Sequence, residues 1–178
     1  AKNFIPYGSK DSLEFVDVFF NIVNYYSLKY SNEKARETGE TYYQYEESTY
    51  ATGEYFKNRG EILPKRKKVV KLFDGITIPS VQDWKELEKS IKEYGLYNSH
   101  RLAIATTGSI SYVLSSTASI LPIKQAVEER TYGNSKTYYP MPFSDVAGFM
   151  YEMGSAYDLE NRKIIDLVAV VQKHIDQG

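Results

Sequence analysis

Residues 102–111 read LAIATTGSIS, and no other stretch says more about the architecture. The first four residues form a short continuous apolar run, which predicts a β-strand buried on both faces. Hydroxyl side chains and Gly108 follow at once, where a strand of this kind turns into a helix. A buried strand cannot satisfy its backbone hydrogen bonds alone. The stretch therefore predicts a sheet with further strands.

The rest of the chain favours helices. Apolar residues at helical spacing, with capping residues and glycine stops, predict helices at about 11–38, 65–74, 81–94 and 160–176. Crowded tyrosines between Glu40 and Gly60 favour short helices and loops, and part of Thr137–Met141 is a further strand candidate. We expect a helix-dominated α/β chain that is one segment of a larger sheet or barrel. Composition marks no internal boundary, so residues 1–178 count as one partial domain.

Composition and charge exclude several classes of protein. Hydrophobic residues make up 42% of the chain and charged residues 25%. This composition is too apolar for a disordered chain and too rich in charge for a membrane protein. The formal net charge is −1, so no overall field attracts nucleic acid or an anionic membrane. No apolar run approaches the roughly 18 residues of a membrane span, and no secretory pattern opens the chain. We expect a cytoplasmic protein without nucleic-acid or membrane partners.

The chain has no cysteine, and its two histidines are His100 and His174. The missing thiols exclude disulfides, thiolate zinc sites, thiol nucleophiles and thiyl radicals on this chain. The two histidines lie far apart in the sequence, so spacing indicates no histidine triad or metal cluster. We expect no metal site here.

The turn from Thr106 to Ile110 is the strongest candidate site. The first N–H groups of a helix have no intrahelical partner and carry partial positive charge, so such a turn can hold a phosphate. Gly108 lets the backbone approach an anion closely, and the Thr107 and Ser109 hydroxyls can complete the shell. The alternative is that Thr107 or Ser109 only caps the helix. The turn is no Walker loop, because it lacks the second glycine and the following lysine.

Five stretches of the chain carry recognisable motifs. Beside residues 105–111 they are STYATGEYF at 48–56, STAS at 116–119 before Pro122-Ile123, EERTYGNSKTYYP at 128–140 and HIDQG at 174–178. Together these motifs resemble the large, catalytic subunit of class I ribonucleotide reductase, in particular its class Ib form, and residues 105–111 resemble that family's A-P-T-G-S-I-S phosphate loop. The resemblance covers essentially the whole chain, and the motifs carry it jointly.

This resemblance implies the C-terminal part of a ten-stranded α/β barrel domain. The loop from Thr106 to Ile110 would then bind the diphosphate of a ribonucleoside diphosphate. Main-chain N–H groups of Thr107, Gly108, Ser109 and Ile110 would contact the phosphates, with the Thr107 and Ser109 hydroxyls adding hydrogen bonds. Thr106 stands where the family usually has proline, and this departure loosens the turn.

The reaction implied by the resemblance needs groups that this chain lacks. The family removes the ribose 3′ hydrogen with a cysteine thiyl radical and takes electrons from a cysteine pair. The catalytic residues would therefore lie on other polypeptide and none on this chain. The resemblance also implies the remaining large-subunit polypeptide, a small subunit with a dimetal centre and tyrosyl radical, a thioredoxin-like reductant, and ATP or deoxynucleotide effectors. This chain would hold none of those cofactors.

A second hypothesis belongs to another class of protein. The chain would be a non-catalytic helical module, a relic or regulator that docks on a reductase or binds phosphate compounds without turnover. Other conspicuous residues are interpreted as structural. We expect packing from Tyr138–Tyr139, surface charge from Glu128–Glu129, a core position for Trp84, and capping or hydrogen bonds from His174 and Asp176.

Overall fold

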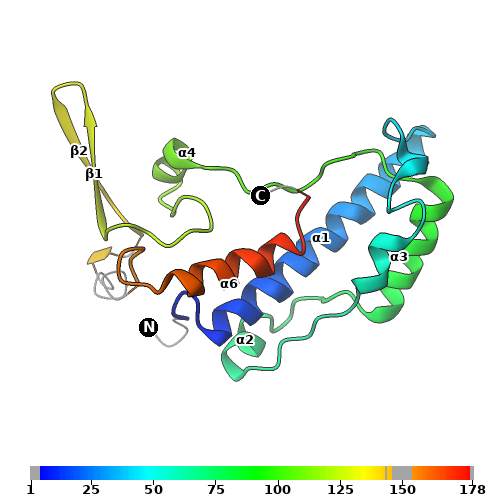
Figure 1. The fold of residues 1–178 in the computed structure, drawn as a ribbon, viewed down its shortest axis with the longest axis horizontal. Helices are drawn as coiled ribbons and strands as arrows, with labels where there is room; N and C mark the ends of the chain where they lie inside the picture. The colour runs from blue at the N-terminus through cyan, green and yellow to red at the C-terminus, as the bar shows by residue number, and fades with distance from the viewer. Residues whose placement is uncertain (1–4, 143, 146–153, 177–178) are drawn as a thin grey trace. The chain divides into compact units, whose positions relative to one another are not determined.

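The computed structural model describes residues 5–142, 144–145 and 154–176. Its helices are α1 (Lys10–Thr38), α2 (Lys67–Leu72), α3 (Val81–Tyr94), α4 (Gly108–Val113) and α6 (Asn161–Gln172), with short 3-10 helices η1 (Tyr45–Glu47) and η2 (Glu54–Asn58) (Figure 1). In these ranges the sheet is one antiparallel pair, β1 (Val127–Tyr132) with β2 (Ser135–Pro140). The helix-dominated prediction is confirmed. Within the described ranges, every helix is too short or too polar to span a bilayer.

The chain divides into two compact units. The loop unit comprises Ala1–Leu13 and Ile104–Ala169, and it carries α4 and the β1–β2 hairpin. The helical unit comprises Glu14–Ala103 and Val170–Gly178, and it carries most of α1 together with α2 and α3.

Local capping sets the ends of α3. The Ser80 hydroxyl accepts a hydrogen bond from the N–H of Asp83 at 3.2 Å, and the Asp83 carboxylate accepts from the N–H of Ser80 at 2.8 Å. This capping box satisfies N–H groups that the helix itself leaves unpaired. Gly95 ends the helix at a φ of 77°, and a Cβ there would lie 2.3 Å from Thr41 Cγ2. Only glycine fits at that position, so both ends of α3 agree with the sequence prediction.

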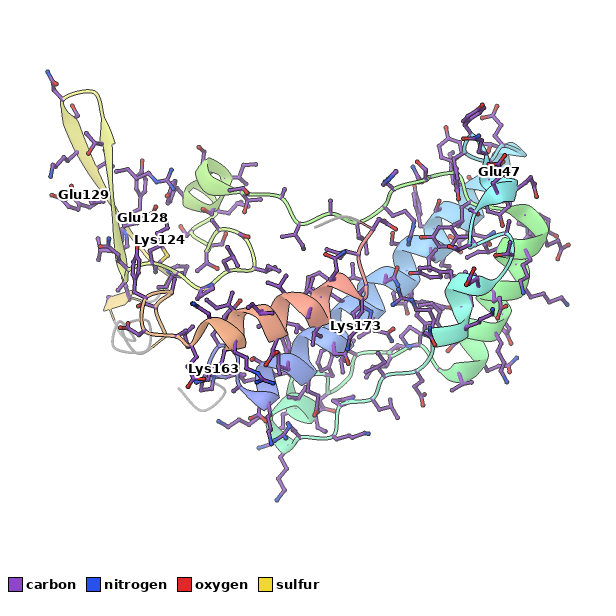
Figure 2. The ribbon with its side chains drawn as sticks, in the orientation of Figure 1. Glu47, Lys124, Glu128, Glu129, Lys163 and Lys173 are labelled. Carbon is purple, nitrogen blue, oxygen red and sulfur yellow. The ribbon has the colours of Figure 1, made fainter. Side chains whose placement is uncertain are left out.

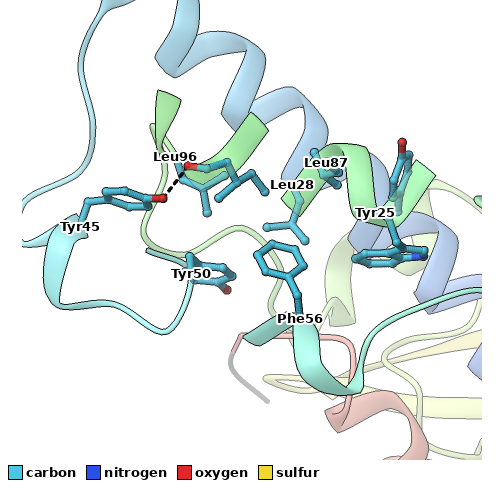
Figure 3. Close-up of a cluster of buried hydrophobic side chains, with 9 residues drawn as sticks. Tyr25, Leu28, Tyr45, Tyr50, Phe56, Leu87 and Leu96 are labelled. Atoms are coloured by element: carbon cyan, nitrogen blue, oxygen red, sulfur yellow. Dashed lines mark hydrogen bonds between the residues drawn. The ribbon is translucent and has the colours of Figure 1, made fainter. Parts of the chain in front are cut away.

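Aromatic and aliphatic side chains of α1 and α3 form the core of the helical unit. Figure 3 shows this cluster, to which the segment between the two helices adds further rings. Its members are Tyr25, Leu28, Tyr45, Tyr50, Phe56, Trp84, Leu87, Ile91 and Leu96. Trp84 is 3% exposed, which confirms its core position. Each fully buried apolar side chain of this size contributes roughly 1.5–3 kcal/mol, so the cluster holds α3 against α1.

The hairpin of the loop unit was foreseen only in its second strand. β2 covers Ser135–Pro140, close to the strand expected within Thr137–Met141, whereas β1 was not expected. The pairing runs from Val127 opposite Pro140 to Tyr132 opposite Ser135. Gly133 takes a φ of 59° in the two-residue turn, as a tight hairpin turn requires.

Residues 102–105 are not a strand, contrary to the prediction. They carry one isolated bridge position, at Ala103, and Ala103 and Ala105 are exposed. The N–H of Leu102 donates to Oδ2 of Asp176 at 2.8 Å, and its carbonyl accepts from the N–H of Asp176 at 3.0 Å. A strand buried on both faces needs a neighbour on each side, and the described residues place no ladder there. The apolar run is therefore an extended segment that is partly exposed to solvent.

Candidate phosphate-binding site

The loop that the sequence singled out borders a cavity of about 350 Å³ in the loop unit. Thr106 and Gly108 line this cavity, whereas Thr107, Ser109 and Ile110 lie outside its lining. Ile110 is 60% exposed. Two of the five predicted residues therefore line the cavity, and the other three lie beside it.

α4 begins within this loop. The N–H of Ser111 donates to the carbonyl of Thr107 at 3.0 Å, which closes the first turn. Thr107 is the N-cap residue, yet its side chain makes no capping hydrogen bond; its hydroxyl accepts from the N–H of Ser119 at 3.3 Å. The structure thus lacks the cap that Thr107 would make under the alternative interpretation. The N–H groups of a first helical turn have no partner within the helix and point away from its N-terminal end. In α4 these groups are part of the loop 106–110.

Charged and aromatic residues that sequence reasoning assigned to no site complete the cavity. Lys124, Glu128 and Arg130 line it together with Tyr112 of α4. Oε1 of Glu128 accepts from Nε and Nη2 of Arg130 at 3.2 and 3.0 Å, and its Oε2 accepts from the Tyr112 hydroxyl at 2.8 Å. Apolar side chains such as Ile123, Met141 and Ile164 line other parts.

Glu128 is more than a surface charge, which corrects the expectation for the Glu128–Glu129 pair. Figure 2 shows the two carboxylates on opposite sides of the hairpin, with Lys124 on the side of Glu128. Partial burial alone would raise the pKa of Glu128, but hydrogen bonds from Tyr112 and Arg130 outweigh it and lower that pKa. Glu129 pairs instead with Lys136 at 2.7 Å. The two carboxylates therefore point apart, as neighbouring residues on a strand do.

Tyr139 packs, as expected, and its partner is the cavity residue Tyr112. The two rings stack with centroids 4.0 Å apart and planes 22° apart. Tyr138, on the other face of the strand, is 60% exposed, so the packing role expected of it is wrong. Tyr139 therefore supports the wall of the cavity from behind Tyr112, while Tyr138 takes no part in it.

A second polar cluster lies in the helical unit around Arg101. Its guanidinium donates to Oδ1 of Asp176 and to the Tyr50 hydroxyl, both at 2.7 Å, and to Oδ1 of Asn24 at 3.1 Å. Oδ2 of Asp176 accepts from the N–H groups of Arg101 and Leu102. Asp176 thus has the hydrogen-bonding role expected of it, with partners that no sequence spacing indicated.

His174 is likewise hydrogen-bonded. Its Nε2 lies 2.7 Å from Oδ1 of Asp17, and the residue is 3% exposed. This agrees with the structural role that the sequence suggested. Among the described residues, no three histidine, aspartate or glutamate side chains converge as a metal site would require.

Comparison with known families decides the identity of the chain. The family model described as ribonucleotide reductase, barrel domain, matches residues 1–146. The chain belongs to this ribonucleotide reductase family. The resemblance read from the motifs at 48–56, 105–111 and 128–140 is confirmed, as is the expectation of a partial barrel segment.

Curated relatives of this ribonucleotide reductase segment match its whole length. The ribonucleoside-diphosphate reductase subunit alpha of Bacillus subtilis is 52% identical over 181 residues, which are 100% of this chain and 26% of that protein. The subunit alpha of Mycoplasma genitalium is 38% identical, with 26% of its length covered. That of Helicobacter pylori is 31% identical, with 22% covered. The chain thus spans about a quarter of the length of these relatives.

Proposed function

We propose that this chain is the part of a ribonucleoside-diphosphate reductase α subunit that binds the substrate's diphosphate. The loop Thr106–Ile110 contacts the phosphates through its main-chain N–H groups, and the Thr107 and Ser109 hydroxyls add hydrogen bonds. One observation carries this assignment: the loop enters α4 at the edge of a cavity whose lining includes Lys124 and Arg130. Cationic side chains beside outward-pointing N–H groups suit an anionic ligand.

The reaction itself takes place on groups that lie outside residues 1–178. This chain has no cysteine, so the thiyl radical and the reducing dithiol belong to the remaining α-subunit polypeptide. A radical-generating small subunit with its dimetal centre, a thioredoxin-like reductant and nucleotide effectors complete the enzyme. Residues 1–178 form one incomplete barrel domain within it and act in deoxyribonucleotide synthesis in the cytoplasm.

Reconstitution tests this function. This chain is mixed with the remaining α-subunit polypeptide, a radical-generating subunit and a reductant, and deoxynucleotide formation is measured. We expect turnover, and we expect the double change Gly108→Val and Ser109→Ala to lower kcat/KM roughly hundredfold, because small displacements in a positioning loop have effects of this size. A Cβ on Gly108 meets nothing nearer than the Arg130 guanidinium at 4.0 Å, so valine enters the cavity rather than the core.

Gly60→Val is the matched control. Nothing lies within 4 Å of a Cβ at Gly60, its φ is not left-handed, and the residue belongs to the helical unit. This variant should keep the turnover of the unmodified chain. Binding of phosphate compounds without any turnover in the complete mixture would contradict the proposal and support the non-catalytic module.

A further inference from the structure

Arg130 faces the first turn of α4 across the cavity of the loop unit. A Cβ atom placed on Gly108 would lie 4.0 Å from both Nη1 and Nη2 of Arg130, and both residues line the same cavity. A guanidinium carries its N–H donors in a planar fork that matches two oxygens of a phosphate. Building on the function proposed above, we infer that Arg130 is a binding residue for the substrate's diphosphate, beside the main-chain N–H groups of the loop.

Neighbouring side chains orient this guanidinium before any ligand arrives. Glu128 accepts from two of its nitrogens, and the Tyr112 ring lies 4.8 Å from its central carbon. Tyr112 is fixed in turn by its own hydrogen bond to Glu128 and by stacking on Tyr139. A long side chain held in this way loses little conformational freedom on binding, which favours affinity.

The charge around the cavity favours an anion. Lys124 and Arg130 contribute two positive charges and Glu128 one negative charge, so the lining carries a net charge of +1. The Arg130 side chain is 37% exposed, so a ligand can reach it without disrupting a sealed interior. An ion pair at this exposure contributes little to stability. The exposure of Arg130 and its position opposite Gly108 therefore suit a ligand-binding role better than a purely structural one.

Position on the strand gives the same assignment. Glu128 and Arg130 are two residues apart on β1, so their side chains share one face of the hairpin. Glu129 lies between them on the other face, where it pairs with Lys136 at 2.7 Å. The hairpin thus carries two Glu–cation pairs, of which one borders the cavity and the other does not. Lys136 is therefore a matched control for Arg130.

The experiment compares Arg130→Gln, Arg130→Lys and Lys136→Gln in the reconstituted reductase, with ADP as substrate. We expect Arg130→Gln to raise KM roughly tenfold to hundredfold, as the loss of one charge-assisted hydrogen bond predicts, with a much smaller change in kcat. Arg130→Lys should recover part of this loss, because the charge remains while the fork is absent. Lys136→Gln should leave KM unchanged.

Two inhibitors separate phosphate binding from a structural effect. Inorganic pyrophosphate carries a diphosphate without sugar or base, and its inhibition constant should rise in Arg130→Gln by about the same factor as KM. Adenosine carries no phosphate, and its inhibition constant should stay the same. A structural defect would instead weaken both inhibitors together, and that result would overturn the role of Arg130.

The outcomes also distinguish this role from the function of the loop. If Arg130→Gln leaves KM and pyrophosphate inhibition unchanged while the double change at Gly108 and Ser109 weakens both, Arg130 is not a phosphate ligand and the loop function stands. If neither set of changes affects pyrophosphate inhibition, both assignments are wrong.

Discussion

Arg101 and Arg130 have similar partners in opposite settings. Arg101 lies in the helical unit with its side chain 3% exposed, and its Nη2 is 2.7 Å from a carboxylate oxygen of Asp176. Arg130 lies in the loop unit with its side chain 37% exposed, and its Nη2 is 3.0 Å from Glu128. Each guanidinium also lies over a tyrosine ring, at 5.3 Å for Tyr50 and 4.8 Å for Tyr112. The arginines differ chiefly in burial.

Burial decides what each pair does. A buried ion pair gains little over an apolar replacement, but removing one partner strands the other charge away from water. The Arg101 pair therefore makes the surrounding conformation hard to change. A half-exposed pair is screened by water and contributes little to stability. The Arg130 pair can consequently exchange interactions with a ligand, and this is the property that a binding cavity needs.

Arg101→Ala should have the largest effect on stability. Removal of the guanidinium leaves Asp176 partly buried without its counter-charge, and we expect the free energy of unfolding of the full chain to fall by about 3–5 kcal/mol. Arg130→Ala should lower it by less than about 1 kcal/mol, because its pair is exposed to water. Urea unfolding of the two variants beside the unmodified chain measures both values. Equal losses would show that burial does not separate the two arginines.

A control on α6 calibrates this experiment. Nε of Arg162 lies 3.8 Å from Asp166, and its side chain is 87% exposed. Arg162→Ala removes the same atoms from an exposed pair, so its effect should be no larger than that of Arg130→Ala. A larger effect would mean that the loss of arginine atoms, rather than the stranding of a charge, accounts for the Arg101 result.

The pH dependence of stability should follow Asp176. Burial alone would raise the pKa of Asp176, but the N–H groups of Leu102 and Arg101, the Arg101 guanidinium and the Tyr50 hydroxyl lower it below its usual value. A carboxyl group with a lowered folded-state pKa contributes stability that is complete above about pH 4 and is lost as the pH falls through the folded-state pKa. We therefore expect the stability difference between the unmodified chain and Asp176→Asn to shrink in acid.

Unfolding measured between pH 7 and pH 2 checks this expectation. Glu128→Gln is the comparison, since hydrogen bonds also lower the pKa of Glu128 but its side chain is 27% exposed against 11% for Asp176. The stability difference between Glu128→Gln and the unmodified chain should be smaller than that of Asp176→Asn at neutral pH, and it should also shrink as the pH falls. A difference for Asp176→Asn that stays constant or grows in acid would contradict the assigned sign.

Local signals could be predicted from the sequence, and long-range pairings could not. Ser80, Asp83 and Gly95 sit at the two ends of α3 and determine them through neighbours within a few residues. Residues 102–105 failed as a predicted strand because strand formation depends on neighbouring strands that the apolar run does not encode. β1 reads VEERTY, which lacks the apolar alternation that marks a half-buried strand.

The candidate site shows the same division. The loop at 106–110 was found because its residues are contiguous, and the motifs at 105–111 and elsewhere identified the family. Arg130 and Glu128 were missed as cavity residues because β1 was not predicted from the sequence. Had β1 been predicted, their two-residue spacing would have placed both side chains on one face of the strand. Arg101 and Asp176 are 75 residues apart, and no spacing rule joins residues at that separation.

The N-caps of α3 and α4 supply the smallest and most specific prediction. Ser80 makes a capping hydrogen bond, so Ser80→Ala should lower the free energy of unfolding by about 1 kcal/mol without changing the KM for ADP. Thr107 makes no capping bond, and its hydroxyl accepts only a long hydrogen bond, 3.3 Å from the N–H of Ser119, so Thr107→Ala should lower the free energy of unfolding by about 0.5 kcal/mol or less. Under the proposed function, Thr107→Ala should instead raise KM.

Urea unfolding measures the stability of the two variants, and steady-state kinetics measures their KM for ADP. We expect Ser80→Ala to lose stability and keep its KM, and Thr107→Ala to keep most of its stability and show a raised KM. A Thr107→Ala variant that loses as much stability as Ser80→Ala and keeps its KM would show that the Thr107 hydroxyl is structural, through the hydrogen bond that it accepts from the N–H of Ser119. The loop would then owe any phosphate binding to its main chain and to Arg130, because that hydroxyl would not be available to the ligand.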